Sequence, residues 1–313
     1  MKVLVTGGAG YIGSVVTDRL LAEGHTVEVL DNLTTGHQDS VLSGATWHQG
    51  EITEAGEILD SSFDAVIHLA AKSLVGESVT HPERYWHGNI VATLGLIDAM
   101  RSAGVRRMVF SSTAAVYGEP GVGQITEDTP AMPTNPYGAS KLAIDHMLTA
   151  EAAAHGMAAV SLRYFNVAGA SGSLRERHDP ETHLIPNLLK VALGDAGEAK
   201  IFGTDYPTRD GTAIRDYIHV VDLADAHLRA LKAAEPGNHA VYNLGTGTGT
   251  TVREVITAVR EVTGIDIPAV EHPRRPGDPA VLVASGQRAL QELGWAPQRS
   301  ITDMVADAWA ALR

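Results

Sequence analysis

The sequence predicts an α/β fold built on a doubly wound parallel sheet. Short β-branched runs alternate with helix-like stretches along the first half of the chain, as in successive β-α-β units. Apolar runs such as 65–69 and 108–110 lack two-residue alternation, which is typical of strands covered by helices on both faces. A glycine-rich turn at 7–13 follows the first run directly, the place where such sheets bind nucleotides.

The expected strands and helices follow one another in a regular order. We expect strands at 3–6, 26–30, 65–68, 107–110 and 159–163, and helices at 14–23, 89–103 and 137–155. After about residue 165, Pro, Gly and charged residues interrupt this regularity at 169–180, 203–211 and 272–279. We therefore expect residues 1–165 to form the sheet domain. Residues 166–313 should form mainly a smaller C-terminal substrate-binding lobe at the carboxyl edge of the sheet, with some segments returning to the sheet.

Composition excludes several classes of function. The 313 residues are 44% hydrophobic, which suffices for a large core. The formal charge of −13, with 37 acidic against 24 basic residues, argues against nucleic acid and anionic membrane as partners. No cysteine occurs, and the 14 histidines show no H-E-x-x-H cluster, so we expect neither disulfides nor a metal site. A strand and a glycine turn occupy the first residues, and no apolar run is long enough to span a bilayer, so we expect a cytoplasmic protein.

The glycine turn predicts a dinucleotide site of the Rossmann type. Gly7, Gly10 and Gly13 stand between a predicted strand and a predicted helix, where glycines permit a tight turn, close approach to a pyrophosphate and helix packing. Asp31 ends the second strand, about 20 residues beyond the glycines, where a carboxylate can accept hydrogen bonds from the adenosine ribose. Because a 2′-phosphate would be repelled there, we expect NAD rather than NADP.

A tyrosine and a lysine are candidates for acid–base chemistry. Tyr137 and Lys141 are four residues apart, which places both on one face of a helix. A free phenol has a pKa near 10, and a neighbouring ammonium together with the positive charge of NAD⁺ would lower it. Upstream, Ser111-Ser112-Thr113 ends a buried strand with three hydroxyls. A hydroxyl at that edge can bridge a reacting oxygen and the phenol.

The chain resembles the UDP-glucose 4-epimerase family of extended short-chain dehydrogenases along essentially its whole length. The motifs that carry the resemblance are Gly7–Ser14, Asp31–Leu33, Val75–Ser78, Ser111–Gly118, Pro136–Lys141, Arg163–Asn166, Asp205–Thr208, Asp210–Thr212, Arg215–Val220, Tyr242–Gly245 and Arg274–Asp278. The glycine and Tyr/Lys motifs belong to the whole superfamily, whereas Arg215–Val220 and Arg274–Asp278 are more particular to members that act on sugar nucleotides.

The resemblance implies a mechanism with a UDP-hexose substrate. Tyr137 removes the proton of the 4-hydroxyl while C4 gives a hydride to bound NAD⁺, the 4-keto sugar turns over, and the hydride returns to its other face. Lys141 holds the nicotinamide ribose, and Thr113 bonds the 4-oxygen. Catalysis is thus expected to rest on Tyr137, Lys141 and Thr113.

The resemblance also implies two sets of binding residues. The expected NAD contacts are Gly7, Gly10, Tyr11, Ile12, Gly13, Asp31, Asn32, Leu33, Thr34, Gly36, Glu51, Ile52, Leu69, Ala70, Ala71, Asn89, Tyr137, Lys141 and Phe165. The expected substrate contacts are Thr113, Tyr137, Asn166, His183, Leu184, Phe202, Arg215, Tyr217, Arg275, Asp278 and Leu282. Three positions depart from the family pattern: Glu51 replaces a common Asp, Lys72 lies one place early, and His183 replaces a common Asn. The roles of Lys72 and His183 therefore stay open.

Alternatives remain within and beyond this family. The 4,6-dehydratases and decarboxylases of nucleotide sugars need an acidic residue where Ala114-Ala115 stands. A 4-epimerase of UDP-glucuronate or of a UDP-pentose survives this test and is the main alternative. N-acetyl UDP-sugars are further candidate substrates because Leu282 stands where some relatives have a larger tyrosine. A regulator that only senses NAD would be expected to lose Tyr137 or Lys141. Family analogy implies a homodimer through helices 89–103 and 137–155, although both could simply cover the sheet of a monomer.

Overall fold

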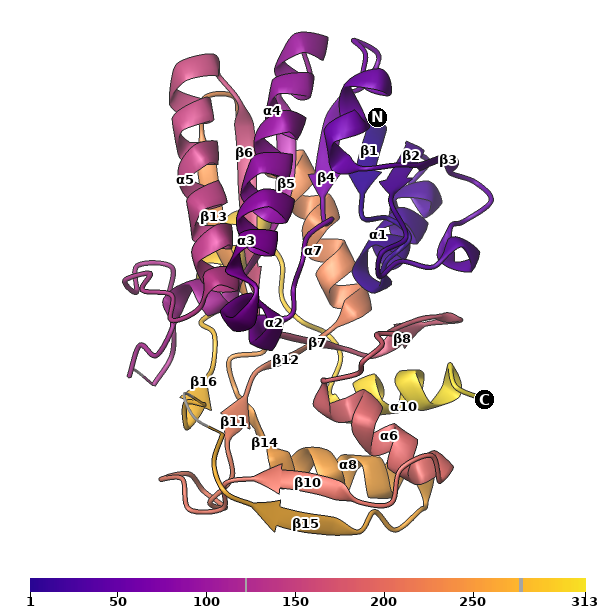
Figure 1. Cartoon of the computed structure of the whole chain (residues 1–313), viewed down its shortest axis with the longest axis vertical. Helices are drawn as coiled ribbons and strands as arrows, with labels where there is room; N and C mark the ends of the chain where they lie inside the picture. Colours follow the sequence, from indigo (N-terminus) through magenta and orange to yellow (C-terminus); the bar gives the residue numbers. More distant parts are fainter. Residues whose placement is uncertain (122, 276–277) are drawn as a thin grey trace.

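A parallel seven-stranded sheet forms the upper half of the molecule in the computed structural model (Figure 1). The structure describes residues 1–121, 123–275 and 278–313; Pro276 and Gly277 of the arginine-rich segment lie outside the described residues. The strand order is β13-β6-β5-β4-β1-β2-β3, and all neighbouring pairs are parallel. The strands are β1 (Lys2–Thr6), β2 (Thr26–Asp31), β3 (Thr46–Gln49), β4 (Ala65–His68), β5 (Arg107–Thr113), β6 (Ala158–Tyr164) and β13 (His239–Leu244).

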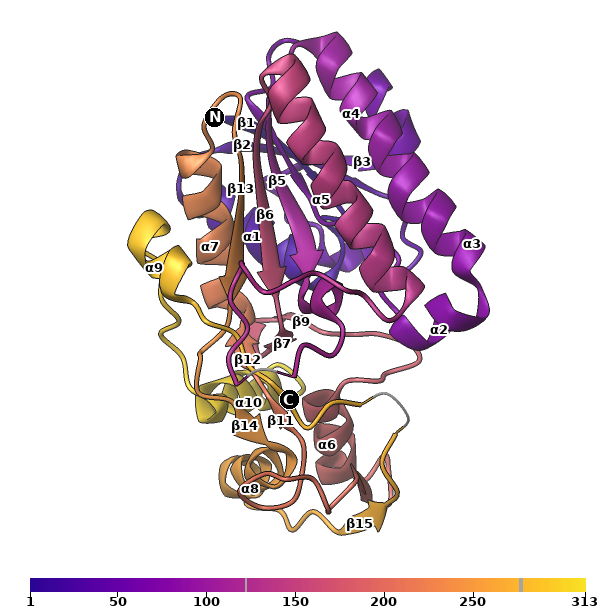
Figure 2. The ribbon, with the colours of Figure 1, turned by 90° about the vertical axis from the view of Figure 1, so that its left-hand side faces the viewer.

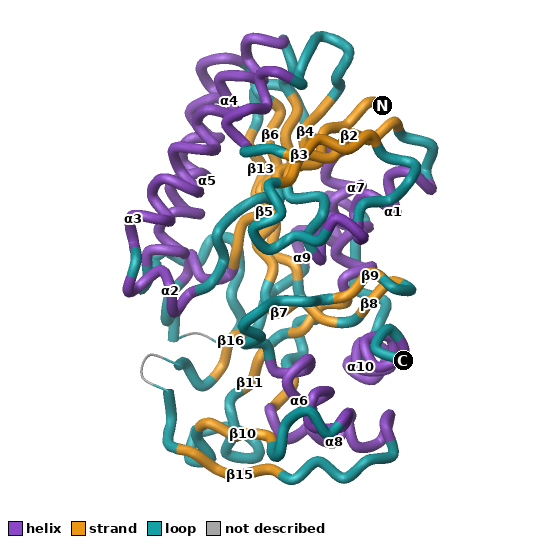
Figure 3. Tube along the Cα trace, turned by 45° about the vertical axis from the view of Figure 1, so that its right-hand side comes forward, coloured by secondary structure: helices purple, strands orange, loops and turns teal. Residues whose placement is uncertain are grey.

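Helices cover both faces of this sheet (Figures 2 and 3). One face carries α1 (Tyr11–Ala22), α7 (Val220–Ala233) and α9 (Gln287–Leu293), and the other carries α4 (Ala92–Ala103) and α5 (Pro136–His155). Val3 and Val5 of β1 pack in the first core, whereas Leu4 between them packs in the second. Consecutive apolar residues of the central strands are buried on both faces of the sheet, which confirms the doubly wound fold predicted from the sequence.

Short elements connect the strands at the edges of the sheet. They are η1 (Gln38–Ser40), η2 (Ile52–Glu57), α2 (Val75–Thr80), α3 (Pro82–Tyr85), the π-helical η3 (Trp86–Val91) and η4 (Ala114–Tyr117). The helix expected at 89–103 is thus η3 followed by α4, and the strand expected at 107–110 continues to Thr113. β5 is longer because Ser111, Ser112 and Thr113 stay paired with β6, as far as Tyr164. Among the described residues, no helix has both the length and the apolar character needed to cross a membrane.

The remaining elements pack below the sheet around a core of their own (Figure 1). The helices are α6 (Leu184–Leu193), α8 (Val252–Thr263) and α10 (Ile301–Ala310). The strand pairs and triplet are β10 (Ala199–Phe202) with β15 (Ala269–His272), β7 (Asn166–Ala168) with β12 (Tyr217–His219), β8 (Ala170–Ser171) with β9 (Leu174–Arg175), and β11 (Ile214–Arg215) between β14 (Thr250–Thr251) and β16 (Val281–Leu282). Strand β13 and helices α7 and α9, although late in the chain, return to the sheet.

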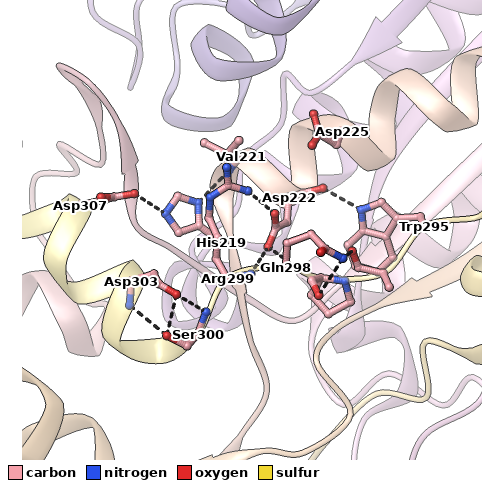
Figure 4. A network of polar contacts seen from close by, with 12 residues as sticks. His219, Val221, Asp222, Asp225, Trp295, Gln298, Arg299, Ser300, Asp303 and Asp307 are labelled. Atoms are coloured by element: carbon pink, nitrogen blue, oxygen red, sulfur yellow. Dashed lines mark hydrogen bonds and ion pairs between the residues drawn. The ribbon is translucent and has the colours of Figure 1, made fainter.

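A buried carboxylate fastens α7 to the C-terminal segment (Figure 4). Asp222, in the first turn of α7, is 1% exposed and accepts bonds from the backbone N–H groups of Gln298 and Arg299 at 2.9 and 3.0 Å. The guanidinium of Arg299 also pairs with it. The backbone carbonyl of Asp222 accepts a 2.8 Å bond from the indole of Trp295. This network joins the sheet domain to α10.

The contacts of Asp222 predict a large loss of stability on truncation. Asp222→Ala should lower the free energy of unfolding by about 3 kcal/mol, because two backbone donors lose their acceptor and Arg299 loses its partner. The matched control is Asp225→Ala on the same helix, whose carboxylate pairs with Arg19 between side chains 34% and 39% exposed; that pair should be worth less than about 1 kcal/mol. Urea unfolding of both variants checks this, and equal losses would contradict the role given to Asp222.

Candidate active site

The glycine turn has the geometry of a dinucleotide cradle. Gly7 has φ +76°, and a Cβ there would lie 2.6 Å from the backbone nitrogen of Ala70. A Cβ on Gly13 would lie 2.1 Å from the carbonyl oxygen of Gly7. Neither position has room for a side chain, so β1, the turn and α1 stay in backbone contact. Helix α1 begins at Tyr11, which leaves its first N–H groups free for an anion such as a pyrophosphate.

The end of β2 presents carboxylates to the adenosine side of this cradle. Asp31 is 8% exposed and accepts bonds from the backbone N–H groups of Ala9 (3.1 Å) and Leu33 (2.8 Å). Burial raises the pKa of Asp31, and these two bonds oppose the rise. Asn32 donates to both carboxylate oxygens of Glu51 at 3.1 Å. The free lone pairs of Asp31 suit ribose hydroxyls, and the residues present therefore fit NAD.

The other residues expected to contact NAD gather around the same edge of the sheet. Leu69, Ala70 and Ala71 follow β4, Ile52 begins η2, and Phe165 follows β6. Tyr11 donates a 2.7 Å bond to the carbonyl of Gly169, so its hydroxyl is engaged with the lower lobe. Leu33 has φ +60°, and it leads into Thr34 and Gly36 in the loop after β2. A strained backbone of this kind is common at ligand-binding loops.

The tyrosine and lysine lie where β5 ends. The ammonium of Lys141 donates a 2.8 Å bond to the carbonyl of Ser111 and lies 4.8 Å from the ring centre of Phe110. Burial lowers the pKa of Lys141 to about 7. Burial raises the pKa of Tyr137, and a hydrogen bond from Thr113 opposes that rise. Desolvation therefore disfavours the charged form of both groups, which moves the two pKa values in opposite directions and further apart than in water.

A buried ion pair next to Lys141 was missed by the sequence reasoning. Arg163 of β6 donates to one oxygen of Asp145 at 2.8 and 3.1 Å, and to the hydroxyl of Tyr117 at 3.0 Å. Tyr117 in turn donates a 2.7 Å bond to Asn243 of β13. Asp145 raises the pKa of Lys141, against the effect of burial. Asp145 lies four residues after Lys141 on the same helix, and this spacing is the sequence signal that could have revealed the contact.

The side chain of Asn89 is buried, and its hydrogen bonds support helix α5. The side chain is 1% exposed, accepts a 2.8 Å bond from the backbone of Lys72, and donates 3.0 Å bonds to the carbonyl of Lys72 and to Ser140. Ser140 donates to the carbonyl of Tyr137 at 2.8 Å. A chain of hydrogen bonds thus runs from the segment after β4, through the π-helical turn, to the backbone carbonyl of Tyr137. The backbone of Lys72 contributes, and its ammonium has no part in this chain.

A cavity of about 510 Å³ lies in the lower lobe. It is lined by eight residues expected to bind substrate: Asn166, His183, Leu184, Phe202, Arg215, Tyr217, Arg275 and Asp278. Arg215 forms an ion pair with Asp278, and the guanidinium of Arg275 lies 3.9 Å from the ring centre of Phe202. Two guanidiniums beside aromatic faces suit a diphosphate and a nucleobase.

Three expected substrate residues lie outside the lining of this cavity. Thr113 and Tyr137 belong to the cluster at the end of β5. Leu282, half-buried in β16, packs with Phe165 against the small core of Val116, Tyr117 and Ile125. Leu282 therefore packs beside η4, and its backbone pairs in register with Arg215 of β11.

Comparison with known proteins shows the family to which this chain belongs. The model of the NAD dependent epimerase/dehydratase family matches residues 3–245. The chain is 54% identical to a UDP-glucose 4-epimerase of Corynebacterium glutamicum over 99% of this chain and 95% of the relative. It is 55% identical to that of Streptomyces lividans over 98% and 95% of the two chains.

Solved structures give the same result. A crystal structure of a UDP-glucose 4-epimerase superposes with a TM-score of 0.95 at 45% identity, covering 99% of this chain and 97% of the other. The enzyme of Bifidobacterium longum, in complex with NAD⁺ and UDP, gives 0.92 at 38% identity over 99% and 98%. The UDP-Glc/GlcNAc 4-epimerase of Campylobacter jejuni gives 0.87 at 37% identity over 99% and 98%. The chain therefore belongs to the NAD dependent epimerase/dehydratase family and, within it, to the UDP-glucose 4-epimerases.

Proposed function

We propose that this protein interconverts UDP-glucose and UDP-galactose by reversible oxidation at C4 of the hexose. The observation that carries the proposal is that the eight residues expected from the sequence to hold substrate line one cavity below the sheet edge that bears Tyr137 and Lys141. The C. glutamicum and S. lividans relatives are both UDP-glucose 4-epimerases. The glycine turn and Asp31 fit NAD, as argued above.

In the proposed mechanism, Tyr137 moves the proton of the 4-hydroxyl. The phenolate takes that proton as the sugar is oxidised and returns it as the sugar is reduced, so no net redox change results. NAD⁺, when bound, supplies the acceptor and later the donor of the hydride, together with a positive charge. Thr113 favours the phenolate form of Tyr137, and the same hydroxyl is suited to bond the 4-oxygen. Lys141 holds its ammonium against the carbonyl of Ser111, where a ribose hydroxyl can share it.

The two parts of the chain take different ligands in this proposal. Residues 1–165 bind NAD, and residues 166–313 bind mainly the nucleoside diphosphate. Arg215 and Arg275 neutralise the diphosphate, and Phe202 and Tyr217 cover the base. Asp278, which pairs with Arg215 in the structure, exchanges that contact for one to substrate or keeps the guanidinium oriented.

A coupled assay tests this function. Purified protein should turn over UDP-galactose without added oxidant and release NAD or NADH on denaturation. UDP-glucuronate and UDP-xylose form the comparison arms, because a 4-epimerase of a uronate or a pentose uses the same chemistry. Faster turnover of either of those sugars than of UDP-galactose would overturn the hexose assignment.

Removing the phenol oxygen should abolish most of the activity. Tyr137→Phe is expected to lower turnover at least about a hundredfold, because general acid–base catalysis typically supplies 10²–10⁴. NAD content should be unchanged. Tyr242→Phe is the matched control, since the Tyr242 hydroxyl bonds Glu292 on α9, away from the site; its turnover should equal that of the wild type. Near-normal turnover of Tyr137→Phe would remove this residue from the proposed role.

The width of the sugar pocket is predicted to depend on Leu282. We expect UDP-N-acetylglucosamine to be turned over less efficiently than UDP-glucose by about 1–3 kcal/mol in kcat/KM, the range for small changes of fit in an apolar pocket. The C. jejuni relative accepts both sugars by its name. Leu282→Tyr should lose the N-acetyl activity and keep that on UDP-galactose. Unchanged relative rates would show that Leu282 is only a packing residue of β16.

We also propose a homodimer through α4 and α5. These two helices lie together on one face of the sheet (Figure 2). Val91, the last residue of η3 before α4, is 52% exposed, and Leu94 of α4 is 46% exposed. These two large apolar side chains lie one turn apart on an outer surface, and burying them is more favourable than leaving them in water. A second copy of the same helices would bury them in a four-helix arrangement.

Light scattering checks the dimer. The protein should show twice the 33.1 kDa mass of one chain, and Leu94→Glu should shift it toward the monomer by placing a charge in an apolar contact. Leu290→Glu is the matched control, because Leu290 on α9 is 53% exposed and lies on the opposite face of the sheet. A monomeric wild type, or equal effects of the two substitutions, would contradict the proposed interface.

A further inference from the structure

Two glutamates and two histidines converge between β9 and α6. Glu176, His178, Glu181 and His183 each offer one ligand atom, and all four atoms lie within 4.8 Å of one another. They come from one short segment with the spacing E-x-H-x-x-E-x-H. The acid–base chemistry and the expected NAD contacts use none of them, and only His183 is among the expected substrate contacts, with a role that the sequence left open.

The imidazole nitrogens point at the carboxylates. Nδ1 of His178 lies 2.9 Å from Oε1 of Glu176, and Nδ1 of His183 lies 2.9 Å from the same oxygen. Nδ1 of His183 is also 2.8 Å from Oε1 of Glu181. Bonds of 2.0–2.2 Å to a tetrahedral Zn²⁺ put its ligand atoms about 3.3 Å apart. Small side-chain rotations are therefore enough to turn this cluster into a coordination shell.

The charge of the cluster favours a dication. The side chain of Glu181 is 3% exposed and that of Glu176 is 8% exposed. Two carboxylates with so little access to water repel each other and need compensating positive charge. One divalent ion with two neutral imidazoles and two carboxylates gives a net charge of zero. Imidazole nitrogen with carboxylate oxygen is also a ligand set that suits zinc.

A cavity beside the cluster gives a metal ion access to it, and the same segment contacts the first half of the chain. A second cavity, of about 330 Å³, is lined by Glu176, His178 and Glu181, whereas His183 lines the substrate cavity. The same segment reaches the first half of the chain, because Arg177 pairs with Asp39 at 2.7 Å. A metal ion at this point would hold the start of α6 and the loop after β2 to one segment.

We propose that Glu176, His178, Glu181 and His183 bind one divalent transition-metal ion, Zn²⁺ as the best match, in a closed structural site outside the reaction centre. This replaces the expectation of no metal site, which rested on the absence of a helical H-E-x-x-H motif. Here the ligands come from a loop whose folding, not its helical period, brings them together.

Zinc binding by the full chain tests the proposal. The protein is prepared without a polyhistidine tag, stripped with EDTA, equilibrated with Zn²⁺, separated from free metal and analysed by mass spectrometry for zinc. We expect about one Zn²⁺ per chain, and a melting temperature that rises with free Zn²⁺ as binding to the folded state requires. A wild type that retains no zinc and shows no shift overturns the proposal, whatever the variants do.

Two ligand variants and one control localise the ion. His178→Ala and Glu181→Gln should each weaken zinc binding by at least about a hundredfold, since loss of even a supporting contact costs 10–100-fold. Glu181→Gln keeps the size of the side chain, so it remains informative if His178→Ala folds poorly. His81→Ala is the control, because His81 faces Glu83 at 3.7 Å with both side chains about half exposed; it should bind like the wild type. Equal zinc affinity in the ligand variants and the control would overturn the assignment.

Discussion

The parallel direction of all seven strands is the constraint on which the site depends. Because the strands are parallel, every strand ends at the same edge of the sheet. This alone brings together the glycine turn after β1, Asp31 at the end of β2, Leu69–Ala71 after β4 and the hydroxyls that end β5. The lower lobe then packs below that edge (Figure 1). The residues expected to bind the cofactor and those expected to bind the substrate therefore lie on either side of this edge.

Burial at this edge sets the chemistry of the charged groups. Lys141 is 2% exposed, and burial lowers its pKa to about 7 even though the carboxylate of Asp145 opposes this decrease. Arg163 holds that carboxylate in place with two hydrogen bonds. The pair also ties α5 to β6. The buried Arg163–Asp145 pair therefore offsets part of the effect of burial on Lys141.

The sequence predicted those parts of the fold and the site that depend on local pattern. Glycine spacing, the apolar strands and the four-residue spacing of Tyr137 and Lys141 are short-range signals, and the family motifs identified the arginines of the lower cavity. The return of β13 to the sheet and the Arg163–Asp145 pair join residues that are distant in sequence or come from different elements. Hydrophobic periodicity does not predict such contacts, because they depend on how the helices and strands pack against one another.

Asn89 supports the structure of the site in addition to the NAD contact that the sequence predicts for it. Its buried amide joins the backbone of Lys72 to Ser140, one turn of helix from Tyr137. A buried amide with every bond made is rigid, and its removal would leave several polar groups unpaired. The π-helical turn at Trp86–Val91 is where the regular helix yields so that this side chain can reach both partners. A chain of hydrogen bonds thus links the segment after β4 to the backbone of Tyr137, and this chain helps to fix the position of the phenol.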